Sequence, residues 1–202
     1  MIRMGTDELE IIQRSQGGDL AAFELLLARY ENKIYSIAYR FMGNHADASD
    51  LAQEAFIKIY QGLSKFRGDS GLLTWMYHVT ANVCRDELRR RQRSKVVPID
   101  TARADYREPI ETLAAGAEFD PEDRAIQKEM QTNVQILLDS LPDDYRLVLI
   151  MRELLGFSYE EIAQHMDCSL GTVKSRLSRA REALRKKVMA NQEIFKEVQV
   201  MR

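Results

Sequence analysis

The sequence predicts an all-α protein in which two small helical domains are joined by a flexible acidic linker. Apolar residues recur at three- and four-residue steps over residues 7–95 and again over residues 122–189, which is the period of an amphipathic helix. The stretch between them lacks that period, contains prolines, and carries nine acidic against four basic side chains over residues 100–129. The expected divisions are a first domain at 1–95, a linker at 96–125, a second domain at 126–189 and a tail at 190–202.

The composition is typical of a soluble protein that stays in the cytoplasm. Of the 202 residues, 45% are hydrophobic and 30% are charged. The N-terminal residues lack the apolar core of a secretory signal, and no apolar run approaches the ~18 residues of a membrane span. Cys84 and Cys168 lie far apart and form no C-x-x-C pair, so we expect reduced thiols. Neither cysteine nor any of the three histidines falls at zinc-ligand spacing, and we expect no metal and no cofactor.

Four helices are expected in the first domain, and glycines mark the ends of the first two. The segment DELEIIQRSQ forms the first helix, which Gly17 and Gly18 close. The second helix begins at Asp19 and ends before Gly43 and Asn44. The residues expected on its buried stripe are Leu20, Phe23, Leu26, Leu27, Tyr30, Ile34 and Ile37.

The third helix is expected from Asp47, and the fourth from about Leu72 to Arg93, with a turn at residues 66–71 between them. The apolar face of the third helix holds Leu51, Ala55, Ile59 and Leu63. The polar residues off this face are Asp50, Gln53, Glu54 and Lys58. The residues that the fourth helix packs inward are expected to be Trp75, Val79, Val83 and Leu88.

The second domain is expected to open with two apolar helices. The stripe of its first helix holds Ile126, Met130, Val134, Leu137 and Leu138. Pro142 suits the first turn of the next helix, because the N–H that proline lacks has no partner there. The residues expected to be buried in that helix are Val148, Met151, Leu154 and Leu155.

The clearest local pattern in the chain is a helix-turn-helix at residues 158–187. Ser158 and Glu161 have the spacing of a capping box, in which each side chain accepts from the backbone N–H of the other residue. Asp167 tolerates the left-handed conformation of a tight turn, and Ser169 can cap the longer second helix. The apolar face of that helix is Val173, Leu177, Ala180 and Leu184.

This second helix is strongly basic, because residues 171–187 hold seven basic side chains and a single acidic one. The side chains expected to be exposed toward its N-terminal end are Thr172, Lys174, Ser175, Arg176, Ser178 and Arg179. A basic helix with short polar residues suits the major groove of DNA, where lysine and arginine meet phosphates and base edges. The alternative is the solvated surface helix of an ordinary bundle.

A second basic run occupies residues 85–95, with six basic and two acidic side chains. Phe66, Trp75 and Tyr77 precede it, and rings beside arginines suit melted nucleic acid because bases stack on rings. Trp75 stands at helical spacing and is better explained as core, which leaves Phe66 as the better base contact. The turn after Phe66 reads RGDS, a cell-adhesion motif, but we expect no adhesion role in a chain without a secretory signal.

A resemblance to the extracytoplasmic-function (ECF) sigma factors of bacterial RNA polymerase is carried by three segments. They are, in order, DASDLAQEAFIKIY, FRGDSGLLTWMYHVTANVCRDELRRRQR and LPDDYRLVLIMRELLGFSYEEIAQHMDCSLGTVKSRLSRAREALR. The similarity is strongest to the envelope-stress sigma-E type and covers roughly residues 10–188. It implies a region 2 that binds the β′ clamp helices and opens the −10 element. It also implies a linker that threads the core enzyme, and a region 4 that binds the −35 element and the β flap.

The resemblance assigns roles to individual positions. Binding of core polymerase falls to Asp50, Gln53, Glu54 and Ile57. Binding of the −10 element falls to Phe66, Arg67, Gly68, Asp69, Ser70 and Asn82. Phe66 would wall a pocket for a flipped base, and Asn82 would bond the base edge or the adjacent backbone.

The −35-reading face is matched by Lys174, Ser175, Ser178 and Arg179, and we expect Thr172 and Arg176 of the same exposed set beside them. Sigma-E relatives carry an arginine at the position of Lys174 and a bulky apolar residue at the position of Ser178. These two departures bear on the −35 sequence that the chain would prefer.

The expected function is that of an alternative sigma factor, which binds core RNA polymerase and directs promoter-specific initiation in a stress response. The resemblance also implies an anti-sigma factor that holds the protein inactive, in some relatives at the inner membrane. No catalytic residue and no small-molecule substrate are expected, because no nucleophile in these motifs has a base beside it.

Two other classes of protein remain open from the residues alone. A helix-turn-helix repressor or activator would sense a ligand through its N-terminal half, dimerise, and bind a palindrome without polymerase. A helical protein-interaction module would show no salt-dependent affinity for DNA. The presence of two separate basic segments, one with aromatic neighbours, favours a sigma factor over both.

Overall fold

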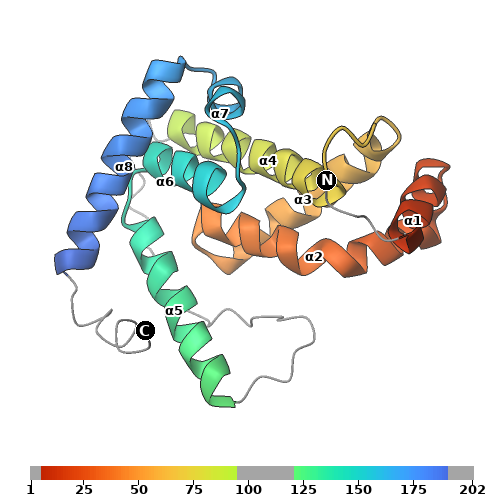
Figure 1. Cartoon of the computed structure of the whole chain (residues 1–202), viewed down its shortest axis with the longest axis horizontal. Coiled ribbons are helices and arrows are strands. Elements are labelled where there is room, and N and C mark those ends of the chain that lie inside the picture. The colour runs from red at the N-terminus through yellow and green to blue at the C-terminus, as the bar shows by residue number, and fades with distance from the viewer. Residues whose placement is uncertain (1–5, 95–120, 191–202) are drawn as a thin grey trace. The chain divides into compact units, whose positions relative to one another are not determined.

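The computed structural model describes residues 6–94 and 121–190, and all regular secondary structure in these two ranges is helical (Figure 1). The chain divides into two compact units, Met1–Val97 and Pro98–Arg202. The expected all-α class is therefore confirmed. Most of the stretch expected as a linker lies outside the described residues, and the helix α5 begins at Pro121, inside that stretch.

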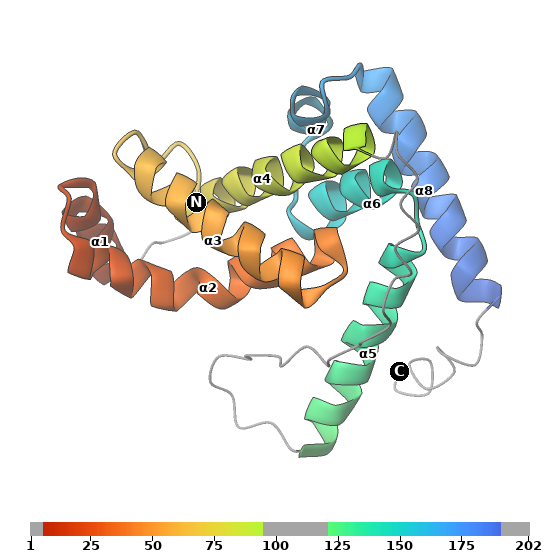
Figure 2. The same ribbon diagram turned by 180° about the vertical axis from the view of Figure 1, so that it is seen from behind.

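In its described part, the first unit is a helical bundle in which α2 contacts each of the other helices. The elements of this bundle are α1 (Thr6–Gln16), α2 (Leu20–Met42), α3 (His45–Leu63) and α4 (Leu72–Ser94). Figures 1 and 2 show α2 and α3 side by side from opposite viewpoints. Gly18 and Gly43 have φ angles of 91° and 76°, so glycines follow α1 and α2 as expected.

Side-chain caps determine where α2 and α3 begin. Asp19 accepts a hydrogen bond from the Ala22 N–H at 3.1 Å, and Asn44 accepts one from the Asp47 N–H at 2.9 Å. Asp19 is therefore the N-cap, and α2 begins at Leu20, one residue later than expected. The expected start of α3 at Asp47 is wrong, because Asn44 is the cap and His45 is the first helical residue.

The core of the first unit includes the whole apolar face that was expected on α3. Its fully buried large side chains are Leu26, Ile34, Phe41, Ile59, Leu63, Met76 and Val83. On α2 the stripe differs at two positions, since Leu20 is 61% exposed and Leu27 is half-buried. Leu20 is the first residue of α2, and the inward face of that turn is taken by Ala22 and Phe23.

The buried face of α4 is displaced by one residue from the expected stripe in its first turns only. Trp75 and Val79 are half-buried, whereas the residues that follow them, Met76 and Thr80, are buried. The Thr80 hydroxyl donates to the Met76 carbonyl at 2.9 Å, which satisfies this polar group inside the core. The other two residues of the expected stripe are buried.

The second unit is organised around α8, which contacts three other helices of the same unit. Its described elements are α5 (Pro121–Asp139), α6 (Asp143–Leu149), the π-helical turn η1 (Ile150–Leu154), α7 (Tyr159–Met166) and α8 (Leu170–Ala190). Its fully buried large side chains include Ile150, Met151, Phe157, Ile162 and Leu177.

The apolar stripe expected on α5 is buried only at its end. Leu137 and Leu138 are 7% and 6% exposed, whereas Met130 is 49% exposed and Val134 is half-buried. The Ile126 side chain lies outside the described residues. The expected stripe is therefore correct in its last turn, where α5 approaches the Leu141 corner, and wrong at Met130.

A π-helical turn at the end of the α6 segment separates two neighbouring leucines. The Leu155 N–H donates to the Ile150 carbonyl at 3.1 Å, five residues back instead of the four of an α-helix. The wider turn changes the direction of the side chains, so that Leu155 is 8% exposed and Leu154 is 48% exposed. The expected burial of Leu154 is therefore wrong.

A buried ion-pair cluster joins α5 to α6. Arg146 has a side chain that is 4% exposed, and its two terminal nitrogens lie 2.9 Å from Asp139 and 2.9 Å from Asp143. Gln135 donates to the same Asp139 carboxylate at 3.1 Å. A buried guanidinium needs such partners, because an uncompensated charge inside a protein costs several kcal/mol. The cluster fixes the corner at which the two helices meet.

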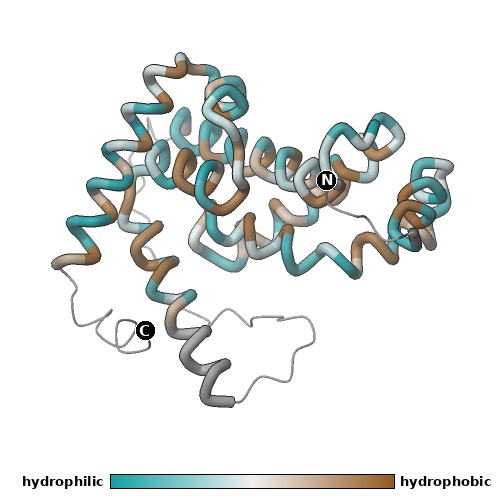
Figure 3. Tube along the Cα trace, viewed as in Figure 1, coloured by the Kyte–Doolittle hydropathy of each residue, from teal (hydrophilic) through white to brown (hydrophobic). Residues whose placement is uncertain are grey.

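Apolar and polar residues are interspersed along the coloured parts of the helices in Figure 3. This pattern lets each helix bury one side and expose the other. Among the described helices, none combines the length and the apolar character that a membrane span requires.

Candidate nucleic-acid interface

Phe66 lies in the loop between α3 and α4, with its ring against the ring of Trp75. The ring centroids are 5.3 Å apart and the planes are tilted by 41°. A Cβ atom on Gly62 would lie 3.2 Å from the Trp75 ring, so the glycine leaves the space that Trp75 occupies beside α3. Asn82 is half-buried about two turns after Trp75, on the same face of α4. The structure therefore packs Phe66 against the half-buried Trp75 ring of α4, and Asn82 lies further along the same helix.

The backbone of this loop is held from α1, a contact that the sequence pattern did not indicate. The Gln16 side chain donates to the Leu63 carbonyl at 3.1 Å and to the Phe66 carbonyl at 2.8 Å. These partners are 47 and 50 residues away in the chain. No local motif marks Gln16, which is one of two glutamines near the end of the first predicted helix.

The RGDS turn presents charged groups to solvent. Arg67, Asp69 and Ser70 are exposed, and Gly68 makes the turn with a φ of 78°. The Arg67 Nε donates to Asp69 at 3.1 Å, although the two side chains are 83% and 76% exposed. An ion pair so exposed contributes less than ~1 kcal/mol, so a DNA phosphate can replace the carboxylate at little cost.

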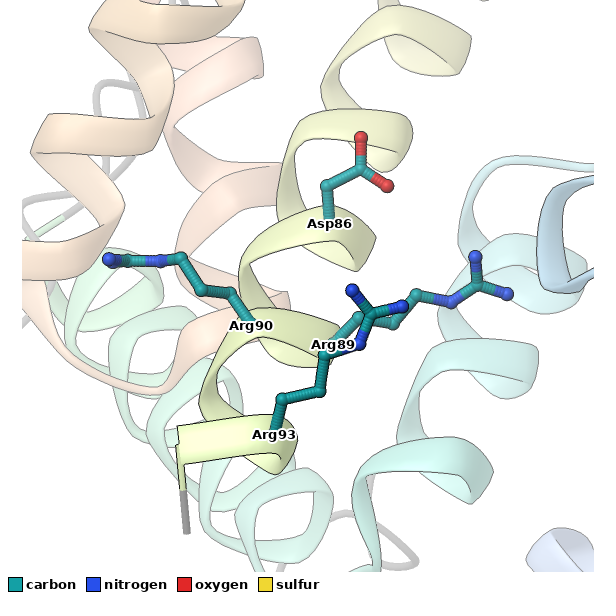
Figure 4. A pocket seen from close by; sticks show the side chains of 4 residues that line it. All are labelled: Asp86, Arg89, Arg90 and Arg93. Atoms are coloured by element: carbon teal, nitrogen blue, oxygen red, sulfur yellow. The ribbon is translucent and has the colours of Figure 1, made fainter. Parts of the chain in front are cut away.

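Three arginines extend from the last turns of α4 and line a hollow of about 330 Å³. In Figure 4 the Arg90 side chain points to one side of this helix and those of Arg89 and Arg93 to the other, with Asp86 nearer the start of the helix. Glu87 accepts two hydrogen bonds from Arg90, at 2.7 and 3.0 Å. This concentration of guanidinium groups suits the phosphates of a nucleic-acid backbone.

Arg91, in the middle of the same basic run, is instead used to join α4 to the start of α3. Its guanidinium lies 2.6 Å from Asp47 and 2.6 Å from Glu87. The hydrogen bond from Arg91 lowers the pKa of Asp47 below its usual value. The hydrogen bond from Arg90, followed by that from Arg91, lowers the pKa of Glu87. A basic run in sequence thus contains one residue whose role is internal.

The four residues expected to bind core polymerase lie on one outward face of α3. Asp50, Gln53, Glu54 and Ile57 are all exposed, and their spacing places them on neighbouring turns. Ile57 is 58% exposed and places an apolar side chain on the same face as the two carboxylates. A face that combines carboxylates with an exposed isoleucine suits a protein partner better than DNA.

The helix-turn-helix in the second unit is built by the local hydrogen bonds that the sequence predicted. The Ser158 hydroxyl accepts from the Glu161 N–H at 3.1 Å, and the Glu161 carboxylate accepts from the Ser158 N–H at 2.7 Å. Asp167 has a φ of 51°, in the left-handed region. The Ser169 hydroxyl accepts from the Thr172 N–H at 3.1 Å and so caps α8. The capping box, the turn and the second cap are therefore confirmed.

Burial of one side of α8 directs the other side to solvent. Val173, Leu177 and Ala180 are at most 1% exposed, while Leu184 is half-buried. The predicted −35 residues that are exposed are Lys174, Ser175, Ser178 and Arg179. These four come from adjacent turns of one helix and form a small polar and basic surface.

Two residues of the expected set differ from these four. Thr172 is half-buried, and its hydroxyl lies 3.0 Å from that of Ser169 in the cap. Arg176 is also half-buried, and its guanidinium lies 2.7 Å from the Asp144 carboxylate on α6. The expectation that Thr172 and Arg176 are exposed is therefore wrong, because Thr172 takes part in the cap and α6 packs close enough to pair with Arg176.

Both cysteines are free thiols, in different surroundings. Cys84 is buried in α4, and this burial raises its pKa far above the usual range. Cys168 is half-buried in the turn between α7 and α8. Within the described residues, no three His, Cys, Asp or Glu side chains gather closely enough to hold a metal ion.

Comparison with protein families identifies both units. The family model of sigma-70 region 2 matches residues 26–94, which include α3, the Phe66 loop and α4. The family model of sigma-70 region 4 matches residues 132–184, which include the helix-turn-helix. The two regions occur in this order in one chain.

Comparison with individual proteins gives the same assignment over nearly the whole length. The chain is 42% identical to the ECF RNA polymerase sigma-E factor of Escherichia coli K12, over 91% of this chain and 94% of the relative. It is 40% identical to RNA polymerase sigma-H factor of Pseudomonas aeruginosa, over 88% and 91%. Among solved structures, the sigma factor RpoE of Bartonella quintana, in complex with the anti-sigma factor NepR, is 26% identical. It aligns with a TM-score of 0.55 over 84% of this chain and 98% of that one. The chain therefore belongs to the ECF family of RNA polymerase sigma factors.

Proposed function

We propose that this sigma factor binds bacterial core RNA polymerase and directs initiation at promoters whose −10 and −35 elements are read by two separate surfaces. The observation that carries the proposal is the presence of two chemically different nucleic-acid surfaces in one chain. The surface in the first unit combines a half-buried ring with exposed arginines. The surface in the second unit is one face of a capped helix.

The surface of the first unit suits a melted strand. A base that leaves the duplex loses stacking worth a few kcal/mol, and a pocket walled by Phe66 returns part of it. The Trp75 ring packs against the Phe66 ring, with the two ring centroids 5.3 Å apart. Arg67 and the arginines at the end of α4 supply charge for the phosphates of the same strand. The −10 role is therefore assigned to Phe66, Arg67, Gly68, Asp69, Ser70 and Asn82.

The surface of the second unit suits a duplex. A helix that enters the major groove contacts base edges with side chains near its N-terminal end. Lys174 and Arg179 are long enough to reach guanine edges or phosphates. The hydroxyls of Ser175 and Ser178 can hydrogen-bond to either donor or acceptor groups on base edges. The −35 role is assigned to these four residues and to Thr172, while Arg176 contributes by holding the helix in place.

The exposed α3 face is the proposed site for the β′ clamp helices of core polymerase, and the second unit would meet the β flap. The Glu54 carboxylate pairs with Lys58 at 2.7 Å, but both side chains are about half exposed. Such a pair exchanges partners readily. Asp50 and Glu54 would meet basic groups of the polymerase, while Ile57 would be buried at the contact.

Control by an anti-sigma factor is the proposed regulation. The related Bartonella quintana sigma factor was solved with the anti-sigma factor NepR bound. A partner that covers either nucleic-acid surface of this chain would prevent promoter binding. The chain would act in the cytoplasm with the polymerase. An anti-sigma factor anchored in the inner membrane would hold the chain at the membrane until a stress signal releases it. Promoter opening would draw on binding energy alone, without enzymatic chemistry.

Run-off transcription with bacterial core polymerase tests this proposal. The template is a promoter selected by the wild-type holoenzyme from a randomised DNA library. We expect specific transcripts with the wild-type chain and with Leu9→Ala, which changes an exposed apolar residue of α1. Phe66→Ala should bind core normally and fail to open the promoter. Tight binding of duplex DNA without any binding of core polymerase would contradict the proposal.

A further inference from the structure

We propose that Gln16, the last residue of α1, is a positioning residue for the loop that carries Phe66. Its side-chain amide holds two carbonyls of that loop, so that α1 takes part in binding the melted strand without touching it. This inference rests on the proposed role of Phe66 in strand binding. It adds a residue from a helix to which no nucleic-acid role is otherwise assigned.

The two hydrogen bonds are made where the chain leaves α3, and the Leu63 carbonyl also accepts from the Phe66 N–H at 3.0 Å. The last carbonyls of a helix lack partners within the helix. Gln16 Nε2 donates to the carbonyl of Leu63, the last residue of α3, at 3.1 Å, and to the Phe66 carbonyl at 2.8 Å. The bond at Phe66 acts on the very residue whose ring is proposed to wall the base pocket. One side-chain amide therefore contacts two carbonyls at the exit of the chain from α3.

The end of α1 is rigid enough to hold a fixed position. Ile12 and Ser15 are 3% and 5% exposed, and the Ser15 hydroxyl donates to the Ile11 carbonyl at 2.8 Å. Arg14, in the last turn of α1, pairs with Asp19 at 2.7 Å across the connection to α2. A side chain fixes a loop only when its own backbone is fixed, and these contacts provide that condition.

Phe66 is thus held from two directions. Its ring lies against Trp75 of α4, and its carbonyl is bonded by Gln16 of α1. A binding loop that is already in its bound geometry avoids the entropy cost of ordering when DNA arrives. Loss of one or two neutral hydrogen bonds should therefore weaken strand binding by about tenfold.

Gln16→Leu removes the donor and keeps a side chain of similar size. Gln13→Leu is the matched control, because Gln13 is exposed on the same helix one turn earlier. Trp75 is the single tryptophan of the chain, so its fluorescence reports on the loop without any DNA present. The experiment measures acrylamide quenching of Trp75 in the full chain. It also measures the thermal midpoint, and the affinity for a single-stranded DNA selected by the wild-type chain from a randomised pool.

We expect Gln16→Leu to increase the quenching of Trp75 and to weaken strand binding about tenfold, while Gln13→Leu changes neither. In a Phe66→Ala background, Gln16→Leu should cause no further loss of strand affinity, because the ring that it positions is gone. A purely structural role would instead lower the thermal midpoint and weaken binding equally in both backgrounds, which would overturn the inference.

The outcomes separate this inference from the proposed function. If Phe66→Ala weakens strand binding and Gln16→Leu does not, the role of Gln16 is wrong and the role of Phe66 stands. If Phe66→Ala leaves strand binding unchanged, both are wrong. Unchanged quenching of Trp75 in Gln16→Leu would also overturn the inference, whatever the DNA affinity.

Discussion

In the second unit, the guanidinium of Arg176 lies 2.7 Å from the carboxylate of Asp144, and this ion pair joins α8 to α6. The side chains are 28% and 44% exposed, so the contact is partly shielded from water. One turn further along α8, Arg181 pairs with Glu153 at 2.6 Å. Two ion pairs thus fasten α8 to the α6 and η1 segment, while Lys174 and Arg179 are exposed.

The two arginines should therefore differ in the salt dependence of DNA binding. Arg179→Gln should reduce the slope of log affinity against log salt by about one, as expected for a lost phosphate contact, and Arg176→Gln should leave the slope unchanged. The measurement is the affinity for a duplex −35 fragment at several salt concentrations. An equal loss of slope in both variants would mean that Arg176 leaves Asp144 to bind DNA.

Gly62→Ala should move Trp75 without destabilising the first unit. The new Cβ would lie 3.2 Å from the Trp75 ring, so the ring must shift by a few tenths of an ångström. Alanine also raises the helix propensity of α3 by about 1 kcal/mol, which offsets the strain. We expect altered Trp75 emission and strand affinity a few times weaker. Gly71→Ala is the control, since its Cβ would be 3.8 Å from the nearest side-chain atom, and it should change neither quantity.

The first unit should lose stability in acid through Asp47 and Glu87. Their pKa values are lowered in the folded state by hydrogen bonds from Arg91 and Arg90. The stabilisation is therefore complete above the ordinary carboxyl pKa and is lost as the pH falls from about 5 toward 2. Arg91→Gln should flatten this part of the profile and cost about 1 kcal/mol at neutral pH, a modest figure because Arg91 is 39% exposed.

Urea unfolding followed by Trp75 fluorescence measures this profile, because the only tryptophan of the chain lies in the first unit. Arg93→Gln serves as the control, since Arg93 is exposed on the same helix, and it should keep the wild-type pH dependence. A wild-type slope in Arg91→Gln would show that other carboxylates carry the acid transition.

Ser158→Ala should destabilise the second unit by about 1 kcal/mol, because it removes the acceptor for the Glu161 N–H at the start of α7. The helical signal of the second unit in thermal unfolding measures this cost. Ser140→Ala is a useful comparison, because that hydroxyl donates to the Leu137 carbonyl at 2.6 Å outside any N-cap. Equal costs at both sites would indicate that the capping box contributes nothing specific.

The two thiols should react at very different rates. Cys84 is fully buried and its pKa is raised by that burial, whereas Cys168 is half-buried in the helix-turn-helix turn. A chromogenic disulfide reagent should label one thiol of the native chain quickly and the second only after unfolding. Cys168→Ser should abolish the fast phase. Fast labelling in that variant would mean that the first unit opens readily around Cys84.

Local patterns made much of the fold predictable. A capping box needs only Ser158 and Glu161, three residues apart, and the left-handed turn needs only a residue that tolerates it, which Asp167 does. Periodicity located the helices and the full buried face of α3. The same periodicity was wrong at Trp75. A large aromatic ring suggested a core position, but the buried positions are those of Met76 and Thr80.

The rest depended on contacts between segments far apart in sequence. Nothing near Arg176 indicates that Asp144 will lie beside it, and nothing near Gln16 indicates that its amide will reach the end of α3. Leu154 was misplaced because a π-helical turn shifts the side chains that follow it by one position. The residue types of the candidate site were enough to select its members. Only the packing of the helices shows which of these side chains are exposed for binding and which hold another element in place.

The buried Arg146 makes substitutions at positions 139, 143 and 146 depend on one another. Replacing Arg146 alone by leucine would leave Asp139 and Asp143 without their shared cation, and replacing either aspartate alone would leave a buried charge underpaired. Single substitutions at this corner are therefore costly, while a joint change to apolar residues can be neutral. Descendants of this sequence should keep all three residues or exchange them together, so that positions 139, 143 and 146 covary among related chains.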